Sequence, residues 1–179
     1  MLTASKKQKG FTIIEFIIVM VILGIIVLLL LPSITTYFSQ NRLKSAAENL
    51  YDDILFGRTS AIQQSTNVTL MLRSGSSWCY GMTTNASCTC TTTNSCNLGQ
   101  ITSAGFPQTS LSTTNLPANG GDTSVTFDSV RGAPTFSSNT TNGIITLSST
   151  INNQIITITI NQLGTSTVCS GGTVGGYGC

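Results

Sequence analysis

The chain has 179 residues, a length that suits one globular domain with its own core and is short for two. Only 8% of the residues are charged, and without Lys6, Lys7 and Lys9 five basic side chains remain against six acidic ones, a balance that disfavours direct nucleic-acid binding. The sequence contains no histidine, which excludes Ser-His-Asp and Cys-His catalytic centres, and no pattern of carboxylates or glycines indicates a catalytic or cofactor site.

A long apolar run follows the three N-terminal lysines. It extends from Ile13 to Leu31 and is interrupted only by Glu15 and Gly24, and no further charge appears before Arg42. A helix of this length can span a bilayer. The positive-inside rule then places the lysines in the cytoplasm and the rest of the chain across the membrane.

A secretory signal peptide and a plain signal anchor are the simpler interpretations of this segment. Both fit poorly, because the apolar run is long for a signal peptide and an acid stands at its start. No cleavage site of the Ala-x-Ala kind follows Leu31, where Pro32-Ser33-Ile34 leads straight into a helical pattern.

The segment Lys9-Gly10-Phe11-Thr12-Ile13-Ile14-Glu15 resembles the class III signal of type IV prepilins, and the resemblance continues through Gly24 and Pro32. It implies that a membrane-embedded prepilin peptidase cuts after Gly10 and methylates the new N-terminal residue, Phe11. It also implies that Glu15 guides addition of the subunit to a filament of other pilins, at an assembly platform in the inner membrane.

The physical chemistry of Glu15 agrees with that role. An ionised carboxylate at bilayer depth is costly when unpaired, so Glu15 requires a partner. The expected partner is an amine, the processed N-terminus of a neighbouring subunit or of the same one. Pro32 lacks a backbone N–H donor and can disturb a helix. The resemblance suggests that the helix is broken or loosened between Gly24 and Pro32 in filaments. Alternatively, Pro32 marks the membrane boundary.

The next segment has the pattern of an amphipathic helix. Its apolar or small face comprises Leu43, Ala46, Ala47, Leu50, Ile54, Gly57 and Ala61. Its charged face comprises Arg42, Lys44, Glu48, Asp52, Asp53 and Arg58. We expect the apolar face to lie on a sheet and the Lys44/Glu48 pair to lie in solvent, with the charges serving solvation or subunit contacts rather than catalysis.

After Ser65 the pattern changes from helix to strand. Short β-rich runs alternate with turns rich in Asn, Gly and Ser. The runs are Thr66–Arg73, Ser124–Asp128, Gly143–Ser148 and Gln154–Asn161. A hairpin is predicted over Thr146–Ile160, with its turn at Asn152-Asn153. The whole predicts an α+β fold of the type IV pilin kind, a long N-terminal helix packed on an antiparallel sheet with disulfide-stapled loops.

The residue pattern together with the resemblance to type IV prepilins implies four segments. They are a leader peptide (1–10), a transmembrane half of the helix that also forms the filament core (11–32), an amphipathic half (33–65) and a β-rich globular head (66–179). The expected location is the bacterial inner membrane, with the head in the periplasm, and then the extracellular pilus.

Six cysteines in a chain with such a start indicate disulfides formed in an oxidising compartment. They are Cys79, Cys88, Cys90, Cys96, Cys169 and Cys179. We expect bonds within the 79–96 loop and one between the last two cysteines. Cys88 and Cys90 are too close to pair comfortably, and the remaining connectivities within the loop stay open.

Metal sites are weakly indicated. Zinc is disfavoured, because the sequence has neither histidine nor Cys-x-x-Cys spacing. An ion near Asp122 and Asp128 stays open, although Gly121-Asp122-Thr123-Ser124 has the composition of a turn.

Features after residue 57 resemble a narrower group, the subfamily that joins GspH pseudopilins with the FimT and FimU minor pilins. They are Arg58–Ile62, a strand that begins at Val68, Ser77-Trp78 with Gly81, the Phe127–Gly132 segment and a final strand pair near the terminal cysteine. The resemblance implies a minor pilin that joins related subunits to initiate or cap a filament. Motility, adhesion and DNA uptake would be properties of the assembled fibre.

Two other functions stay open. An H-type pseudopilin of a type II secretion system would share all the N-terminal features. A FimT-like DNA receptor for natural transformation would use basic residues near the C-terminus, whereas only Arg131 follows Arg73 here, which disfavours that function.

Overall fold

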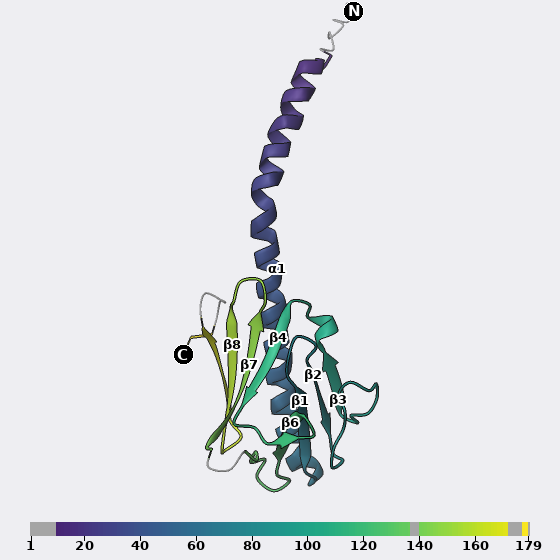
Figure 1. Cartoon of the computed structure of the whole chain (residues 1–179), viewed down its shortest axis with the longest axis vertical. Coiled ribbons are helices and arrows are strands. Elements are labelled where there is room, and N and C mark those ends of the chain that lie inside the picture. The colour runs from purple at the N-terminus through teal and green to yellow at the C-terminus, as the bar shows by residue number, and fades with distance from the viewer. Residues whose placement is uncertain (1–9, 137–139, 172–176, 179) are drawn as a thin grey trace, which may run out of the picture. The chain divides into compact units, whose positions relative to one another are not determined.

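The computed structural model describes the backbone of residues 10–136, 140–171 and 177–178, and the side chains of these residues except 29–33 and 119. The chain divides into two compact units, Met1–Tyr37 and Phe38–Cys179, and each is described by itself. One helix, α1 (Ile13–Gln64), contributes to both units (Figure 1). It ends at Ser65, whose φ of 50° is left-handed, and the N–H of Thr66 closes the last turn by donating to the carbonyl of Ala61.

Two antiparallel sheets lie against the second half of α1 (Figure 1). The first has the order β3-β2-β1-β6-β5 and the second β4-β7-β8-β9. The strands of the first sheet are β1 (Val68–Arg73), β2 (Cys79–Thr83), β3 (Gly99–Thr102), β5 (Ala118–Asn119) and β6 (Asp122–Phe127). Those of the second are β4 (Thr109–Thr114), β7 (Asn142–Ser149), β8 (Ile155–Asn161) and β9 (Ser166–Gly171). A short 3-10 turn, η1 (Ser103–Gly105), precedes β4.

The predicted α+β class is confirmed, with two sheets in place of the single sheet expected. The predicted hairpin is confirmed as well, since β7 pairs with β8 in a register that sets Thr146 opposite Thr157. The sheets are joined where Gly75, after β1, forms a bridge with Leu111 of β4. Strand β1 pairs with β6 as well as with β2, so the first sheet contains a connection that crosses over.

The core lies between α1 and both sheets. The apolar helix face expected from the sequence is confirmed, because Leu43, Leu50 and Ile54 are completely buried. They belong to one cluster with strand residues of both sheets, among them Phe127 and Ile158. Opposite this face, Lys44 and Glu48 form the predicted exposed pair, with Nζ and Oε1 3.7 Å apart.

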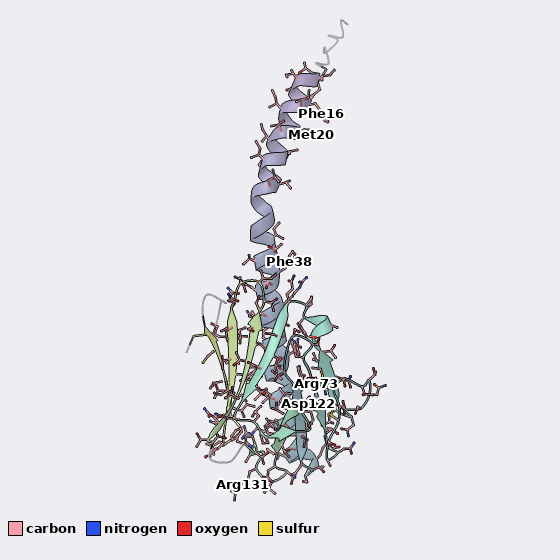
Figure 2. All side chains as sticks on the ribbon, viewed as in Figure 1. Phe16, Met20, Phe38, Arg73, Asp122 and Arg131 are labelled. Atoms are coloured by element: carbon pink, nitrogen blue, oxygen red, sulfur yellow. A yellow bond between two sulfur atoms is a disulfide. The ribbon has the colours of Figure 1, made fainter. Side chains whose placement is uncertain are left out.

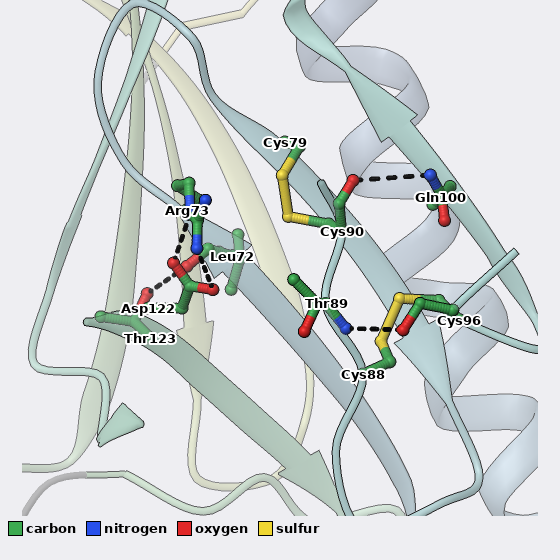
Figure 3. The surroundings of a disulfide bond; sticks show 11 residues. Leu72, Arg73, Cys79, Cys88, Thr89, Cys90, Cys96, Gln100, Asp122 and Thr123 are labelled. Atoms are coloured by element: carbon green, nitrogen blue, oxygen red, sulfur yellow. Dashed lines mark hydrogen bonds and ion pairs between the residues drawn. A yellow bond between two sulfur atoms is a disulfide. The ribbon is translucent and has the colours of Figure 1, made fainter. Parts of the chain in front are cut away.

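Two disulfides hold the loop between β2 and β3 (Figure 3). Cys79 is bonded to Cys90 and Cys88 to Cys96, which confirms disulfides within this loop and resolves their connectivity. The loop packs closely on β2, because a Cβ at Gly81 would collide with the sulfur of Cys96. The predicted bond between Cys169 and Cys179 lies outside the described residues, since Cys179 is not among them.

Candidate functional site

The predicted processing site lies just before the helix. Gly10, Phe11 and Thr12 are not helical, and α1 begins at Ile13. The hydroxyl of Thr12 accepts a hydrogen bond from the backbone N–H of Glu15 (3.3 Å), and the carbonyl of Thr12 accepts one from Phe16 (3.2 Å). Thr12 is therefore the N-cap, and Thr12-x-x-Glu15 has the spacing of a capping box. The Gly10–Phe11 bond is left outside the regular helix.

In the described part of its own unit, the first half of α1 has no apolar partner for residues 11–28. Every side chain from residue 11 to residue 28 is exposed, including those of Phe16 and Met20 (Figure 2). Apolar surface of this extent is not stable in water, so this helix requires lipid or other helices around it.

The membrane span predicted over residues 11–32 includes 29–32, whose side chains lie outside the described set. Among the described residues, no helix has both the length and the apolarity needed to cross a bilayer. The backbone of α1 is helical through Gly24 and Pro32 in the isolated chain. A proline removes one backbone hydrogen-bond donor from a helix and adds a local clash, but a long helix can continue through it. The break between Gly24 and Pro32 in the assembled filament stays a prediction.

A buried polar contact fixes the second half of α1 to the first sheet. The hydroxyl of Tyr80, on β2, donates to Oδ2 of Asp53 on the helix (2.8 Å). Burial raises the pKa of both groups. The negative charge of Asp53 raises the pKa of Tyr80 further, whereas the hydrogen bond from Tyr80 acts to lower the pKa of Asp53. This contact positions the helix and leaves neither group free for other chemistry.

The two aspartates considered for an ion have separate partners. Asp122 accepts two hydrogen bonds from the guanidinium of Arg73, at 2.7 and 3.2 Å, and the two side chains point toward each other (Figure 3). This hydrogen bond and the charge of Asp122 raise the pKa of Arg73. Asp128 accepts a hydrogen bond from the backbone N–H of Arg131 (2.8 Å), as in a turn. No group of three potential metal ligands gathers among the described residues.

A groove of about 800 Å³ lies between α1 and β9. Ala47, Tyr51 and Val168 supply apolar walls, and Glu48 and Asp52 supply carboxylates. Glu48 accepts a hydrogen bond from the Tyr177 hydroxyl (2.8 Å), and burial together with this bond raises the pKa of Tyr177 to about 12.

The capping role of Thr12 was not expected from the sequence, although the spacing of Thr12 and Glu15 carried the signal. The contact of Tyr80 with Asp53 was not expected either, because no local pattern joins residues 27 positions apart on a strand and a helix.

Comparisons with known proteins agree with the resemblance stated above. The model of the family described as type II transport protein GspH matches residues 46–164, and the prokaryotic N-terminal methylation motif matches residues 5–31. No curated protein matches the chain.

Two solved structures match this chain. One is the type IV minor pilin FimU of Pseudomonas aeruginosa strain PAO1, with 15% identity and a TM-score of 0.50, over 74% of this chain and 91% of that one. The other is the minor pseudopilin EpsH from the type 2 secretion system of Vibrio cholerae, with 14% identity and a TM-score of 0.46, over 73% of this chain and 98% of that one.

The match to the family model is the one that assigns the chain. It covers more than half of the sequence, and it includes α1 from residue 46 to its end and most of both sheets. The methylation motif covers the N-cap, Glu15 and the exposed helix. The chain belongs to the GspH family, and hence to the superfamily of type IV pilins and pseudopilins.

Proposed function

We propose that the chain is a minor type IV pilin, a structural subunit that is cleaved after Gly10, methylated at Phe11 and added to a filament through its N-terminal helix. The observation that carries the proposal is that one chain combines two features: a methylation motif on a helix whose side chains are exposed from residue 11 to residue 28, and a GspH-type head. No catalytic function is needed for this role. The subunit joins other pilins and helps to initiate or cap the fibre.

The proposed sequence of locations follows from the same features. The helix first lies in the inner membrane, with the head in the periplasm, where an oxidising milieu permits the two disulfides. The peptidase and the assembly platform act there, and the subunit then leaves the membrane as part of the filament. In the bilayer Glu15 pairs with the amine of a processed N-terminus, because an unpaired carboxylate is costly at that depth.

Processing is tested by co-expressing the full chain with a prepilin peptidase. Gly10→Val should accumulate in the uncut form, whereas wild type should yield a chain that begins with N-methylated Phe11, as read by mass spectrometry. Gly24→Ala is the matched control, because a Cβ at Gly24 or at Gly10 meets no atom within 4 Å. Normal processing of the Gly10 variant would contradict the proposal.

The role of Glu15 is tested separately. Glu15→Gln keeps the shape and polarity of the side chain but not its charge, so it should be processed normally and fail to enter filaments. Incorporation of Glu15→Gln at the wild-type level would show that assembly does not need a pair between the Glu15 carboxylate and an N-terminal amine.

A second candidate is an H-type pseudopilin of a type II secretion system, which the description of the matching family favours. Deletion of the gene in its own bacterium distinguishes the two. Loss of surface pili with normal protein secretion supports the pilin, and loss of secretion with normal pili supports the pseudopilin.

A further inference from the structure

One end of the second unit gathers three segments that are distant in the sequence (Figure 1). They are the start of the unit on α1 (38–42), the loop before β4 (106–108) and the turn between β7 and β8 (150–154). The hydroxyls of Ser39 and Ser149 are buried and lie 2.7 Å apart. The hydroxyl of Ser149 also accepts a hydrogen bond from the N–H of Ile151 (3.3 Å), so the turn is fixed beside α1.

Gln108 links the same turn to the helix a second time. Its Oε1 accepts a hydrogen bond from Nη1 of Arg42 (3.2 Å). Its carbonyl accepts two more from Thr150, one from the N–H (3.0 Å) and one from the hydroxyl (3.2 Å). The residues that this network sets side by side are here called the Phe38 surface: Phe38, Arg42, Gln108, Thr150 and Ile151.

The Phe38 surface exposes large apolar side chains. Phe38 is 53% exposed (Figure 2), and Ile151 is 45% exposed at the tip of the fixed turn. Ile155, the first residue of β8 after this turn, is 39% exposed. Apolar side chains gathered on one surface indicate a contact site, and little conformational entropy is lost when a fixed turn is covered.

The Phe38 surface is basic. Its three segments contain one charged residue, Arg42, and otherwise only apolar, hydroxyl and amide side chains. Within the described part of the chain Arg42 forms no ion pair. The next carboxylate along α1, Glu48, lies 3.7 Å from Nζ of Lys44 and accepts a hydrogen bond from Tyr177. A guanidinium without a carboxylate, set beside apolar side chains, fits a partner that presents anionic groups above an apolar layer.

The place of this surface in the chain indicates which partner has that chemistry. Phe38 follows the proposed membrane segment, 11–32, by six residues, and six residues span at most about 22 Å even when fully extended. The Phe38 surface therefore stays near the bilayer for as long as that segment lies in it. The interface of a bilayer favours aromatic and basic side chains, and anionic lipids there attract arginine.

We propose that the Phe38 surface docks on a bilayer that contains anionic phospholipid. In this arrangement Phe38 and Ile151 enter the membrane interface, and the guanidinium of Arg42 binds headgroup phosphates. The inference rests on the proposed function, because it requires residues 11–32 to lie in the membrane. It goes beyond that function by giving the head a lipid-binding surface of its own.

The experiment uses the full chain in nanodiscs, a single copy per disc, made of phosphatidylglycerol and of phosphatidylcholine that is brominated in its acyl chains. Bromine quenches tryptophan fluorescence only at short range, and the chain's own tryptophan, Trp78, is 1% exposed and gives a constant background. Ile151→Trp should lose fluorescence in these discs, and Leu163→Trp should not. Leu163 is the matched control, because it is exposed on the turn at the other end of β8.

Charge variants of the Ile151→Trp chain test the headgroup contact. Arg42→Gln should lower the ratio of docked to undocked heads about fivefold, the effect of one arginine at an anionic surface. Arg42→Lys keeps the charge and should dock, and Arg131→Gln, at the opposite end of the unit (Figure 2), should have no effect. In discs of phosphatidylcholine alone, chains with Arg42 and with Arg42→Gln should be quenched alike.

A third reporter, Phe16→Trp, separates the inference from the proposed function, because Phe16 lies in the segment assigned to the bilayer. If Phe16→Trp is quenched and Ile151→Trp is quenched no more than Leu163→Trp, the inference alone is overturned. If Phe16→Trp is not quenched, the membrane stage of the proposed function is wrong and the inference falls with it. Quenching of Ile151→Trp that is unchanged by Arg42→Gln in the anionic discs overturns the headgroup contact. Quenching that requires two copies per disc indicates a contact between proteins and also overturns the inference.

Discussion

The contact of Tyr80 with Asp53 offers a sharp test of how α1 is held on the first sheet. Tyr80 is 1% exposed, and its hydroxyl is 2.8 Å from the carboxylate. Tyr80→Phe removes only the hydroxyl and keeps the ring, which stacks with Trp78 at a centroid distance of 6.2 Å. Asp53 then remains half-buried without its donor.

A hydrogen bond to an ionised group contributes about 1.5–3 kcal/mol, so we expect the free energy of unfolding to fall by about 2 kcal/mol at pH 7. For a unit of this size that corresponds to a decrease of about 4–8 °C in the melting temperature. Burial already raises the pKa of Asp53 above its unfolded value, and loss of the donor raises it further. The folded state therefore binds a proton at Asp53 more tightly than the unfolded state does. This binding stabilises the folded state at acid pH, and the stabilisation is lost as pH rises through the pKa of Asp53 in the folded state.

The measurement is thermal unfolding of the full chain in detergent, followed by circular dichroism at pH 7 and near pH 4. The deficit of Tyr80→Phe should be largest at pH 7 and should shrink as pH falls, because the raised pKa of Asp53 makes the folded state take up a proton more readily. With Asp53→Asn as the second variant, a double-mutant cycle should give a coupling of about 1 kcal/mol or more. Equal stability of Tyr80→Phe and wild type at pH 7, or strictly additive effects, would refute the reasoning.

Three further predictions concern the loop, the aspartates and the helix start. Gly81→Ala should destabilise the unit by about 1–3 kcal/mol in urea unfolding, because the added Cβ collides with Cys96. Gly105→Ala should be neutral, because its Cβ meets no atom within 4 Å, and equal effects of the two variants would contradict this. Calcium should not raise the melting temperature, because Asp122 is bound to Arg73 and Asp128 to its own turn; a calcium-dependent increase would disprove this assignment. Thr12→Val should lower the stability of the start of α1 by about 1 kcal/mol, because the N-cap hydrogen bond is lost, and should speed hydrogen exchange at the amide of Glu15. Thr12→Ser should keep this amide protected, and unchanged exchange in Thr12→Val would show that Thr12 does not cap α1.

The helix and its apolar face could be predicted because their signals are local. Leu43, Leu50 and Ile54 repeat at the helical period, and all three are buried. The hairpin of β7 and β8 is equally local, with β-branched residues on both sides of Asn152-Asn153. The processing motif is a contiguous string of residues, so it too is readable without a fold.

The remaining parts depend on contacts between distant residues. Strand β2 (Cys79–Thr83) is buried at every position and contains a glycine, so it has neither the alternation nor the composition of a typical strand. The pair of Arg73 and Asp122 forms only because β1 lies beside β6, which sets Leu72 opposite Thr123. Likewise the disulfide connectivity follows from how the loop folds onto Gly81, and cysteine spacing alone does not encode it.

In the proposed function, the charge of Glu15 favours assembly because the helix itself does little to stabilise it. Glu15 lies in the first turn of α1, where the positive end of the helix dipole stabilises a carboxylate by about 0.3–1 kcal/mol. At the centre of a bilayer, an unpaired carboxylate costs about 2.5 kcal/mol or more, and the cost falls toward the interface. The dipole offsets less than half of that central cost, so a Glu15 carboxylate drawn deep into the membrane needs a further cationic partner. In the proposed function, cleavage after Gly10 would create a cationic amine at Phe11. An amine supplied by a neighbouring subunit would then make addition to a filament more favourable than remaining a monomer in the bilayer.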